Sequence, residues 1–304
     1  MAPIDALLAD PNTNTVDHIV HLTPPGTVGQ VSEDFRKIGF HVLPGGTHSD
    51  GLTANALVIL ADGAYLELIS FTHPPEYYKK GTPERTKRDA HRWAQKAPGF
   101  IDFAFLGTGT RLPSISETIN RRAKEEGSGV SYIPEVDGGR VRPDGAVLEW
   151  LISSVQEQES IGILPFFCGD VTTRELRVPI NPPSNVEHPS TATGVAHIRV
   201  LVSEHSYTTY QRQLTTVIGH QPAQISPRET KWSLDRPIAL EGGHSSPQLL
   251  LSVPSNREEE QFFESSRGQF HHSVYEIGIF VRNLADSPEE VSTPYGKIRF
   301  VERK

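Results

Sequence analysis

The sequence predicts an α+β fold in which a strand–helix–strand–strand–strand unit is repeated along the chain. Short, apolar, β-branched segments of strand length recur, which is the pattern of buried strands. Between them lie polar segments that end at glycine, as helices commonly do. The same order of elements occurs twice over residues 15–170 and begins a third time near residue 195. Internal repetition of this kind predicts similar modules packed together.

The first unit shows the order of elements most clearly. Its helix is predicted over residues 32–38, with Ser32 as the N-cap and Gly39 as the stop. Residues 44–51 form a glycine-rich loop, and residues 61–63 form the turn of a hairpin. We expect its strands at residues 15–22, 40–43, 53–60 and 64–70.

The second and third units repeat this order with more variation. A polar helix over residues 83–96 connects the first unit to the second. The helix of the second unit is expected over residues 114–126, with a later turn at 137–139, and the helix of the third unit over residues 207–218. Their strands are expected at residues 100–106, 130–136, 146–153, 163–168, 195–201, 223–226, 231–234, 249–253 and 274–281.

Domain boundaries follow from these repeats and from one proline-rich segment. We expect a two-module domain over residues 15–170 and an appended α+β unit over residues 194–304. Residues 171–193 fit no regular element and contain several prolines, so they are predicted to be a linker. His271 and His272 follow an acidic stretch and are expected at the surface.

Composition excludes several classes of protein. The chain has 304 residues, of which 36% are hydrophobic and 22% charged, and its net charge is −8, which argues against nucleic-acid binding. No segment reaches the roughly 20 apolar residues of a membrane span. Residues 1–14 lack the features of a signal peptide, and the single cysteine, Cys168, fits a reducing compartment, so we expect a cytoplasmic protein. Cys168 lies in an apolar strand and is interpreted as a small buried hydrophobe.

Two buried strands each carry one polar group that an apolar strand should avoid. His18 lies in the strand Val-Asp-His-Ile-Val, and Glu67 lies in the strand Tyr-Leu-Glu-Leu. An unpaired buried carboxylate is costly, so Glu67 needs a proton or a partner. The simplest partners of these two side chains are each other, or a metal ion between them. If both strand faces line one concave sheet, a site lies there.

Four ordered motifs in the first unit resemble the vicinal oxygen chelate superfamily, and more narrowly its glyoxalase-like group. They are the Val16–Val20 strand, a Gly-Gly-x-His loop ending at His48, a Thr-x-Asn-x-Leu strand containing Asn55, and the Tyr65–Leu68 strand. The Pro-Phe-Phe strand of residues 165–167 is similar to the end of the second module in that group. The resemblance implies two modules that curl side by side into a cupped, partly open mixed β-barrel.

The resemblance also implies a divalent metal ion. On the family pattern, His18 and Glu67 are ligands of Fe, Mn, Zn or Ni, ions that nitrogen and oxygen donors suit. The second module departs from that pattern, because Phe103 and Gly169 occupy the positions equivalent to His18 and Glu67. His197 of the third repeat is a candidate for the third ligand.

Several other side chains are candidates for the site. His48 is an alternative to His197 as the missing donor, and Glu276 is a weaker one. His48 lies in a loop at a strand end and suits proton transfer near pH 7, so it is the catalytic candidate together with Glu67. Asn55 either orients a substrate carbonyl or fixes the glycine-rich loop, and Tyr65 either lines the site or packs in the core.

Two functions of different classes follow. The first is a metal-dependent lyase, isomerase or dioxygenase acting on a small oxygenated organic molecule. The second is a metal-free protein that binds and sequesters a small molecule. Both imply a small-molecule partner and neither nucleic acid nor membrane, and we leave a homodimer open beside a monomer. The sequence favours the enzyme, because His18, His48 and Glu67 occur together in the first module.

Overall fold

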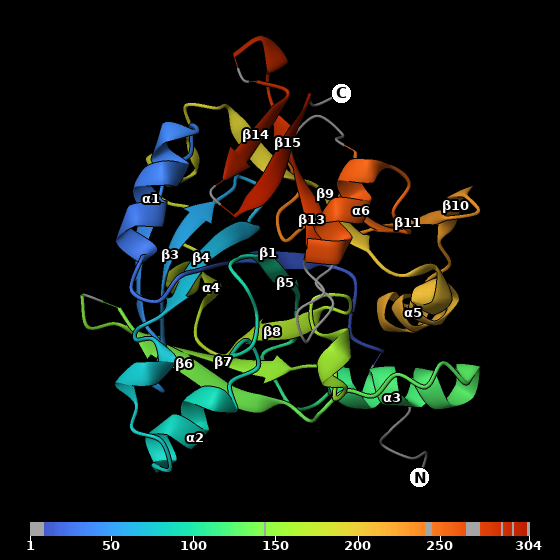
Figure 1. The fold of residues 1–304 in the computed structure, drawn as a ribbon, viewed down its shortest axis with the longest axis horizontal. Helices are drawn as coiled ribbons and strands as arrows, with labels where there is room; N and C mark the ends of the chain where they lie inside the picture. Colours follow the sequence, from blue (N-terminus) through green and yellow to red (C-terminus); the bar gives the residue numbers. More distant parts are fainter. Residues whose placement is uncertain are drawn as a thin grey trace.

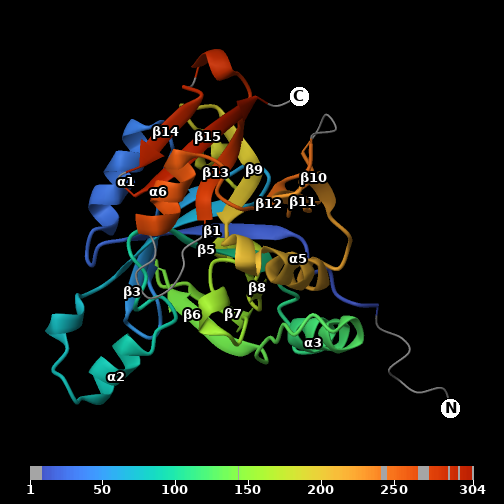
Figure 2. The same cartoon turned by 45° about the vertical axis from the view of Figure 1, so that its right-hand side comes forward.

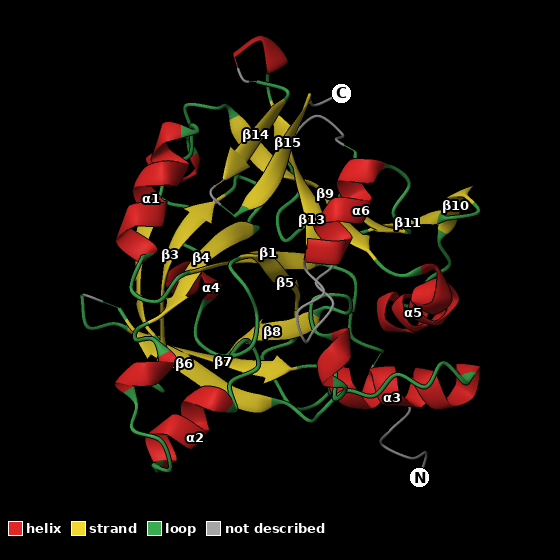
Figure 3. Ribbon diagram, viewed as in Figure 1, coloured by secondary structure: helices red, strands yellow, loops and turns green. Residues whose placement is uncertain are grey.

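The computed structural model describes residues 9–142, 144–240, 245–265, 274–286, 288–293 and 295–302, and it confirms the predicted α+β fold of paired modules. His271 and His272 lie outside the described residues. Strands form two mixed sheets, and the helices lie around them (Figure 3). No helix in the described ranges is long and apolar enough to cross a membrane.

The first sheet contains eight strands in the order β2-β3-β4-β1-β5-β8-β7-β6, and they curl around a common axis (Figure 1). Its first module consists of β1 (Val16–Thr23), α1 (Val28–Lys37), β2 (Leu43–Thr47), β3 (Thr53–Ile59) and β4 (Tyr65–Phe71). Its second module consists of β5 (Gly99–Leu106), α3 (Ile115–Glu126), β6 (Val136–Val141), β7 (Val147–Ser153) and β8 (Phe166–Asp170). The two modules meet where β1 pairs antiparallel with β5.

The ends of this sheet approach each other and almost close the barrel. His48, just after β2, forms a β-bridge with Arg140 of β6, and the Ser49 N–H donates to the Gly139 carbonyl at 3.0 Å. This seam corrects two predictions, because residues expected in a loop at 44–51 form most of β2, and those expected in a turn at 137–139 form half of β6. Gly45 explains the first, since a Cβ there would lie 2.0 Å from the Asn55 Oδ1 atom of β3. Glycine therefore allows the two strands to pair closely.

The second sheet contains seven strands in the order β10-β11-β12-β9-β13-β15-β14. The third repeat supplies β9 (Ala192–Leu201), α5 (Glu204–Ile218), β10 (Ala223–Ser226), β11 (Glu229–Ser233) and β12 (Gln248–Ser252). A reduced fourth repeat, which we did not predict beyond its first strand, supplies β13 (Val274–Val281), η5 (Leu284–Asp286), β14 (Glu290–Thr293) and β15 (Gly296–Glu302). β9 pairs antiparallel with β13, as β1 does with β5.

Shorter elements connect these modules. The predicted helix at 83–96 is limited to α2 (Pro83–Asp89). The predicted linker contains regular structure, because α4 (Arg174–Arg177) and η4 (Pro183–Val186) lie within residues 171–193, and the division into domains there stays a prediction. The remaining elements are η2 (Pro75–Tyr77), η3 (Gln158–Ser160) and α6 (Arg257–Ser265).

The helices begin and end where local chemistry dictates. Ser114 caps α3 by accepting the Glu117 N–H, and Gly127 ends it at a φ of 66° that other residues adopt with strain. The predicted N-cap Ser32 instead lies inside α1, where its hydroxyl donates to the Val28 carbonyl. α3 and α5 lie side by side and join the two sheets on the outside (Figures 1 and 2). One hydrophobic core runs continuously through both sheets.

Candidate functional site

A bulge in β1 places two polar residues next to each other. The pairing of β1 with β5 shifts between Val16 and His18, so Asp17 is the extra residue. His18 Nδ1 lies 2.7 Å from Asp17 Oδ2 and donates to it, because a carboxylate only accepts. The other ring nitrogen, Nε2, lies 3.8 Å from Oε2 of Glu67 on β4. Asp17 is therefore the residue that orients His18.

Asn55 fixes the carboxylate of Glu67. Its Nδ2 donates to Glu67 Oε1 at 2.6 Å, while its Oδ1 accepts the Gly46 N–H at 3.1 Å. Of the two roles considered for Asn55, the structure shows the contact to the glycine-rich segment, and it adds the bond to Glu67. This bond occupies Oε1 and leaves Oε2 on the side of His18.

His48 approaches Glu67 from the sheet seam. Its Nε2 lies 3.7 Å from Glu67 Oε1, its Nδ1 lies 2.6 Å from the Thr53 hydroxyl, and its ring meets Trp150 edge-on. Burial, the largest influence, lowers the pKa of His48 although Glu67 opposes the shift. The imidazole of His48 is therefore neutral near pH 7 and can accept a proton.

These side chains line a cavity of about 70 Å³ inside the first sheet. Its lining contains polar, aromatic and aliphatic side chains, and nearly every one of them is buried. The lining residues are His18, His48, Asn55, Leu57, Tyr65, Glu67, Trp93, Arg140, Trp150, Ile152, Phe166, Cys168 and Arg177. Cys168 is buried, as predicted, and burial raises the pKa of its thiol.

Arg177 of α4 connects Asp17, Tyr65 and Asp170 by hydrogen bonds. Its guanidinium donates to Asp17 at 2.8 and 3.1 Å, to the Tyr65 hydroxyl at 2.8 Å and to Asp170 Oδ2 at 2.8 Å. Arg174 adds a second contact to Asp17 at 2.6 Å. Burial would raise the pKa of Asp17, but the two guanidinium groups hold it well below its usual value. Asp17 is therefore a carboxylate that keeps His18 in a fixed tautomer.

Tyr65 packs against His18 rather than standing free in the cavity. The two rings are stacked with centroids 4.7 Å apart, and the Tyr65 hydroxyl is occupied by Arg177. Tyr65 and Asp17 therefore fix the imidazole of His18 from two directions.

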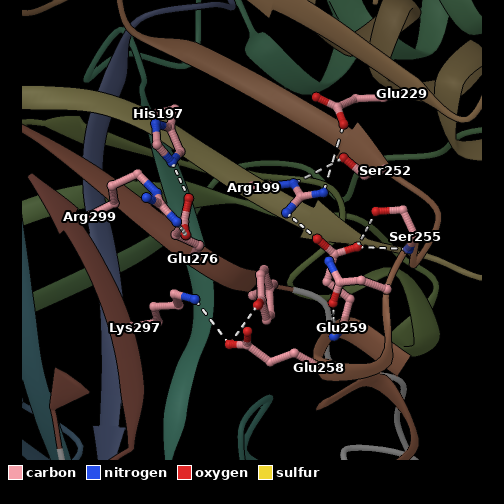
Figure 4. Close-up of polar contacts among 12 residues, drawn as sticks. His197, Arg199, Glu229, Ser252, Ser255, Glu258, Glu259, Glu276, Lys297 and Arg299 are labelled. Atoms are coloured by element: carbon pink, nitrogen blue, oxygen red, sulfur yellow. Dashed lines mark hydrogen bonds and ion pairs between the residues drawn. The ribbon is translucent and has the colours of Figure 1, made fainter. Parts of the chain in front are cut away.

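The structure does not bring His197 to this cavity. His197 lies on β9 in the second sheet, where its Nε2 is 2.9 Å from Glu276 Oε1, and Glu276 also accepts a bond from Arg299 at 3.2 Å (Figure 4). The predicted grouping of His197 with His18 and Glu67 is wrong in position, because the third repeat builds its own sheet. The same holds for Glu276 as an alternative donor.

His18 and Glu67 are two side chains in the cavity that offer donor atoms for a metal ion. His18 Nε2 and Glu67 Oε2 face each other, and outer hydrogen bonds to Asp17 and Asn55 orient both groups, as is usual for metal ligands. Within the described part of the chain, no group of three or more His, Cys, Asp or Glu side chains is arranged to hold a metal ion. The donor chemistry therefore fits a metal held by two side chains, with open positions.

Comparison with known families decides the affiliation of the chain. The model of the glyoxalase-like domain family matches residues 16–218, more than half of the sequence. The chain belongs to the glyoxalase-like family of the vicinal oxygen chelate superfamily. None of the curated proteins matches this glyoxalase-like chain in sequence.

Solved structures show the same fold at low sequence identity. A hypothetical protein from Staphylococcus aureus aligns over 95% of this chain and 99% of its own, with 13% identity and a TM-score of 0.64. The Mn(II)-bound glyoxalase from Novosphingobium aromaticivorans aligns over 96% of this chain and 82% of its own, with 8% identity and a TM-score of 0.51. These similarities support the fold of the glyoxalase-like chain.

Sequence reasoning missed three residues of the site. Arg177 lies in the segment interpreted as a linker, Arg140 follows residues interpreted as a turn, and Asp17 was not among the candidate residues. The only usable sequence signal was the Asp-His pair within an apolar strand, since a buried aspartate needs a partner. Nothing in the local sequence connects Arg177 with Asp17, because 160 residues separate them.

Proposed function

We propose that this chain is an enzyme that acts on a small oxygenated organic molecule in the cavity of the first sheet, with a divalent metal ion held by His18 and Glu67. The observation that carries the proposal is the geometry of His18. Its Nδ1 is bound to a carboxylate that two arginines keep ionised, and its Nε2 faces the free oxygen of Glu67. A carboxylate-bound histidine beside a second carboxylate is typical of a metal ligand.

A metal ion bound there would supply Lewis-acid polarisation of substrate oxygens. Neighbouring side chains hold the two metal-binding groups in position. Asn55 holds Glu67 by Oε1, so that Oε2 stays available, and Tyr65 and Asp17 prevent rotation of the His18 ring. Two protein donors would leave the other coordination positions to substrate and water.

His48 is the proton-transfer group in this proposal. It is neutral near pH 7 because burial lowers its pKa, and its Nε2 faces the cavity beside Glu67. It can therefore take a proton from a carbon or hydroxyl of the substrate and return it elsewhere. Trp93, Trp150 and Phe166 form the apolar wall and keep bulk water away from this transfer.

A metal-free binding protein is the second candidate. The observation that favours it is the Asn55–Glu67 hydrogen bond at 2.6 Å, which already gives the buried carboxylate one partner. The absence of a three-donor group among the described residues points the same way.

Elemental analysis of protein purified without chelator separates the two candidates. The enzyme proposal expects about one transition-metal ion per chain, and loss of that ion in Glu67→Gln. The Gln carbonyl can still accept the Asn55 bond, so the variant should fold. If the wild-type protein holds no metal and gains none on addition of Mn²⁺, Fe²⁺, Zn²⁺ or Ni²⁺, the metal-free binder replaces the enzyme.

A further inference from the structure

Arg140 is a buried cation that the site described above does not use. It is 4% exposed and lines the cavity beside His48 at the sheet seam. Among the described residues, its side chain makes one hydrogen bond, from Nη1 to Asn55 Oδ1, at a long 3.4 Å. Within the described ranges of the chain, no carboxylate forms an ion pair with it.

The other guanidinium in the same cavity shows what a structural arginine looks like here. Arg177, equally buried, donates to Asp17, Asp170 and Tyr65 and fills its hydrogen-bonding capacity. Arg140 has five N–H donors, and among the described residues only one acceptor, the Oδ1 atom of Asn55, lies within hydrogen-bonding distance of them. Burying a charge without a partner is costly, so its place in the cavity wall needs another explanation.

Pairing with Glu67 is not that explanation. Asn55 lies between the two charges, with its Oδ1 toward Arg140 and its Nδ2 toward Glu67. The amide separates cation and anion and leaves the remaining N–H groups of Arg140 for something else. Burial lowers the pKa of Arg140, yet a guanidinium keeps its charge in proteins.

We propose that Arg140 binds the carboxylate of the substrate, which makes the substrate class a small 2-oxo or 2-hydroxy acid. The planar fork of a guanidinium matches a carboxylate, and one unpaired cation balances one negative charge. A phosphate with two negative charges would carry one more than Arg140 neutralises, and the carboxylate of Glu67 would repel it. A cavity of about 70 Å³ has room for a small acid. The 2-oxo or 2-hydroxy group is the part of this proposal that rests on the proposed function, because its oxygen would be directed to the metal ion held by His18 and Glu67.

The test measures binding in the presence of chelator, so that it does not depend on the metal. Pyruvate, its neutral analogue pyruvamide and inorganic phosphate are titrated into the full-length protein, with the fluorescence of Trp93 and Trp150 in the cavity wall as the readout. The variants are Arg140→Gln, Arg140→Lys and, as the matched control, Arg142→Gln. Arg142 lies two residues away and is paired with Asp144 at 2.7 Å, outside the cavity lining.

The proposal expects pyruvate to bind the wild-type protein and Arg142→Gln equally, and to bind Arg140→Gln about tenfold or more weakly. Arg140→Lys should recover part of this loss, and pyruvamide should bind all four proteins alike. The proposal is overturned if pyruvate fails to bind the wild type, if Arg140→Gln binds it normally, or if phosphate binds more tightly than pyruvate. Pyruvate binding that depends on Arg140, together with a protein that takes up no metal, would keep the carboxylate site and remove the metal.

A thermal melt supplies a readout that a structural arginine would not give. Removal of an unpaired buried cation relieves a cost, so Arg140→Gln without ligand should melt at or above the wild-type temperature. Pyruvate should raise the melting temperature of the wild type and leave that of Arg140→Gln unchanged. A clear loss of stability in Arg140→Gln without ligand would show that Arg140 supports the fold, and would contradict the proposal.

Discussion

The two sheets carry the same His-Ile pair in two different settings. His18-Ile19 of β1 and His197-Ile198 of β9 each lie on a central strand beside a parallel and an antiparallel partner. In the first sheet, the His18 Nε2 atom faces a cavity and lies 3.8 Å from Glu67. In the second sheet, the His197 Nε2 atom forms a 2.9 Å hydrogen bond with Glu276.

The difference lies in how completely the surrounding charges are paired. Figure 4 shows the second sheet, where the charged groups near α6 form ion pairs with one another. The pairs in the figure include His197–Glu276, Arg299–Glu276, Arg199–Glu259 and Lys297–Glu258. Lys297 also forms an ion pair with Glu290. In the first sheet, Glu67 and Arg140 line a cavity without a direct ion pair to each other. Buried charge without a direct ion pair, rather than the presence of a strand histidine, therefore distinguishes the candidate site in the first sheet.

The largest expected effect is on stability and compares two arginines. Arg177→Met removes the partner of buried Asp17 and Asp170 and should lower the free energy of unfolding by about 3–5 kcal/mol. Arg299→Met should cost about 1 kcal/mol or less, because the Arg299 side chain is 36% exposed. Urea denaturation measures both. Equal losses would show that the two polar clusters do not differ in this way.

The next comparison exchanges each buried glutamate for its amide. Glu276→Gln should lower the free energy of unfolding by about 1–3 kcal/mol, because His197 and Arg299 lose an ionised acceptor, and metal content should not change. Glu67→Gln should alter stability little and remove the metal. Thermal melts and elemental analysis of both variants test these expectations. Loss of metal in Glu276→Gln, with metal retained in Glu67→Gln, would place the metal site in the second sheet instead of the first.

The acid side of the stability curve should respond to Glu276. Burial would raise the pKa of Glu276, but hydrogen bonds from His197 and Arg299 hold it at about 2, below the ordinary 4.5. The folded pKa is the lower one, so this contribution is complete above pH 4.5 and is lost as the pH falls toward 2. Stability measured from pH 5 to pH 2 should therefore fall less steeply in Glu276→Gln than in the wild type. An identical slope would contradict the low pKa.

The smallest expected effect concerns His48. Because its pKa is lowered by burial, the imidazole should stay neutral at pH values where an ordinary histidine with a pKa of 6.5 is half protonated. An NMR titration of the His48 Cε1 proton measures this directly. His48→Ala should change stability by no more than about 0.5–1 kcal/mol, since its one strong side-chain bond is to the Thr53 hydroxyl. A normal pKa would contradict the effect of burial on His48.

Much of the fold could be predicted because its signals are local. The apolar strands β1 and β4 and the glycine stops of α3 and α5 appear where the sequence indicates them. β2 and β6 were missed because proline and glycine normally indicate turns. Here these residues form the closing strands of a barrel, where Gly45 permits close contact with Asn55.

The candidate site was only partly predictable, for a different reason. His18, His48, Asn55, Tyr65 and Glu67 lie in one module and were found from its motifs. Arg177 and Arg140 come from distant parts of the chain, and only the folded barrel brings them to the same cavity. His197 was misassigned because its strand resembles that of His18, while its partner Glu276 is 79 residues away.

The most direct test of the difference between the two sheets is a Mn²⁺ titration of three proteins by isothermal calorimetry: wild type, His18→Gln and His197→Gln. The account predicts that the wild type and His197→Gln bind one Mn²⁺ with the same affinity and that His18→Gln binds none. Binding that survives in His18→Gln, or that is lost in His197→Gln, would contradict the assignment of the functional site to the first sheet.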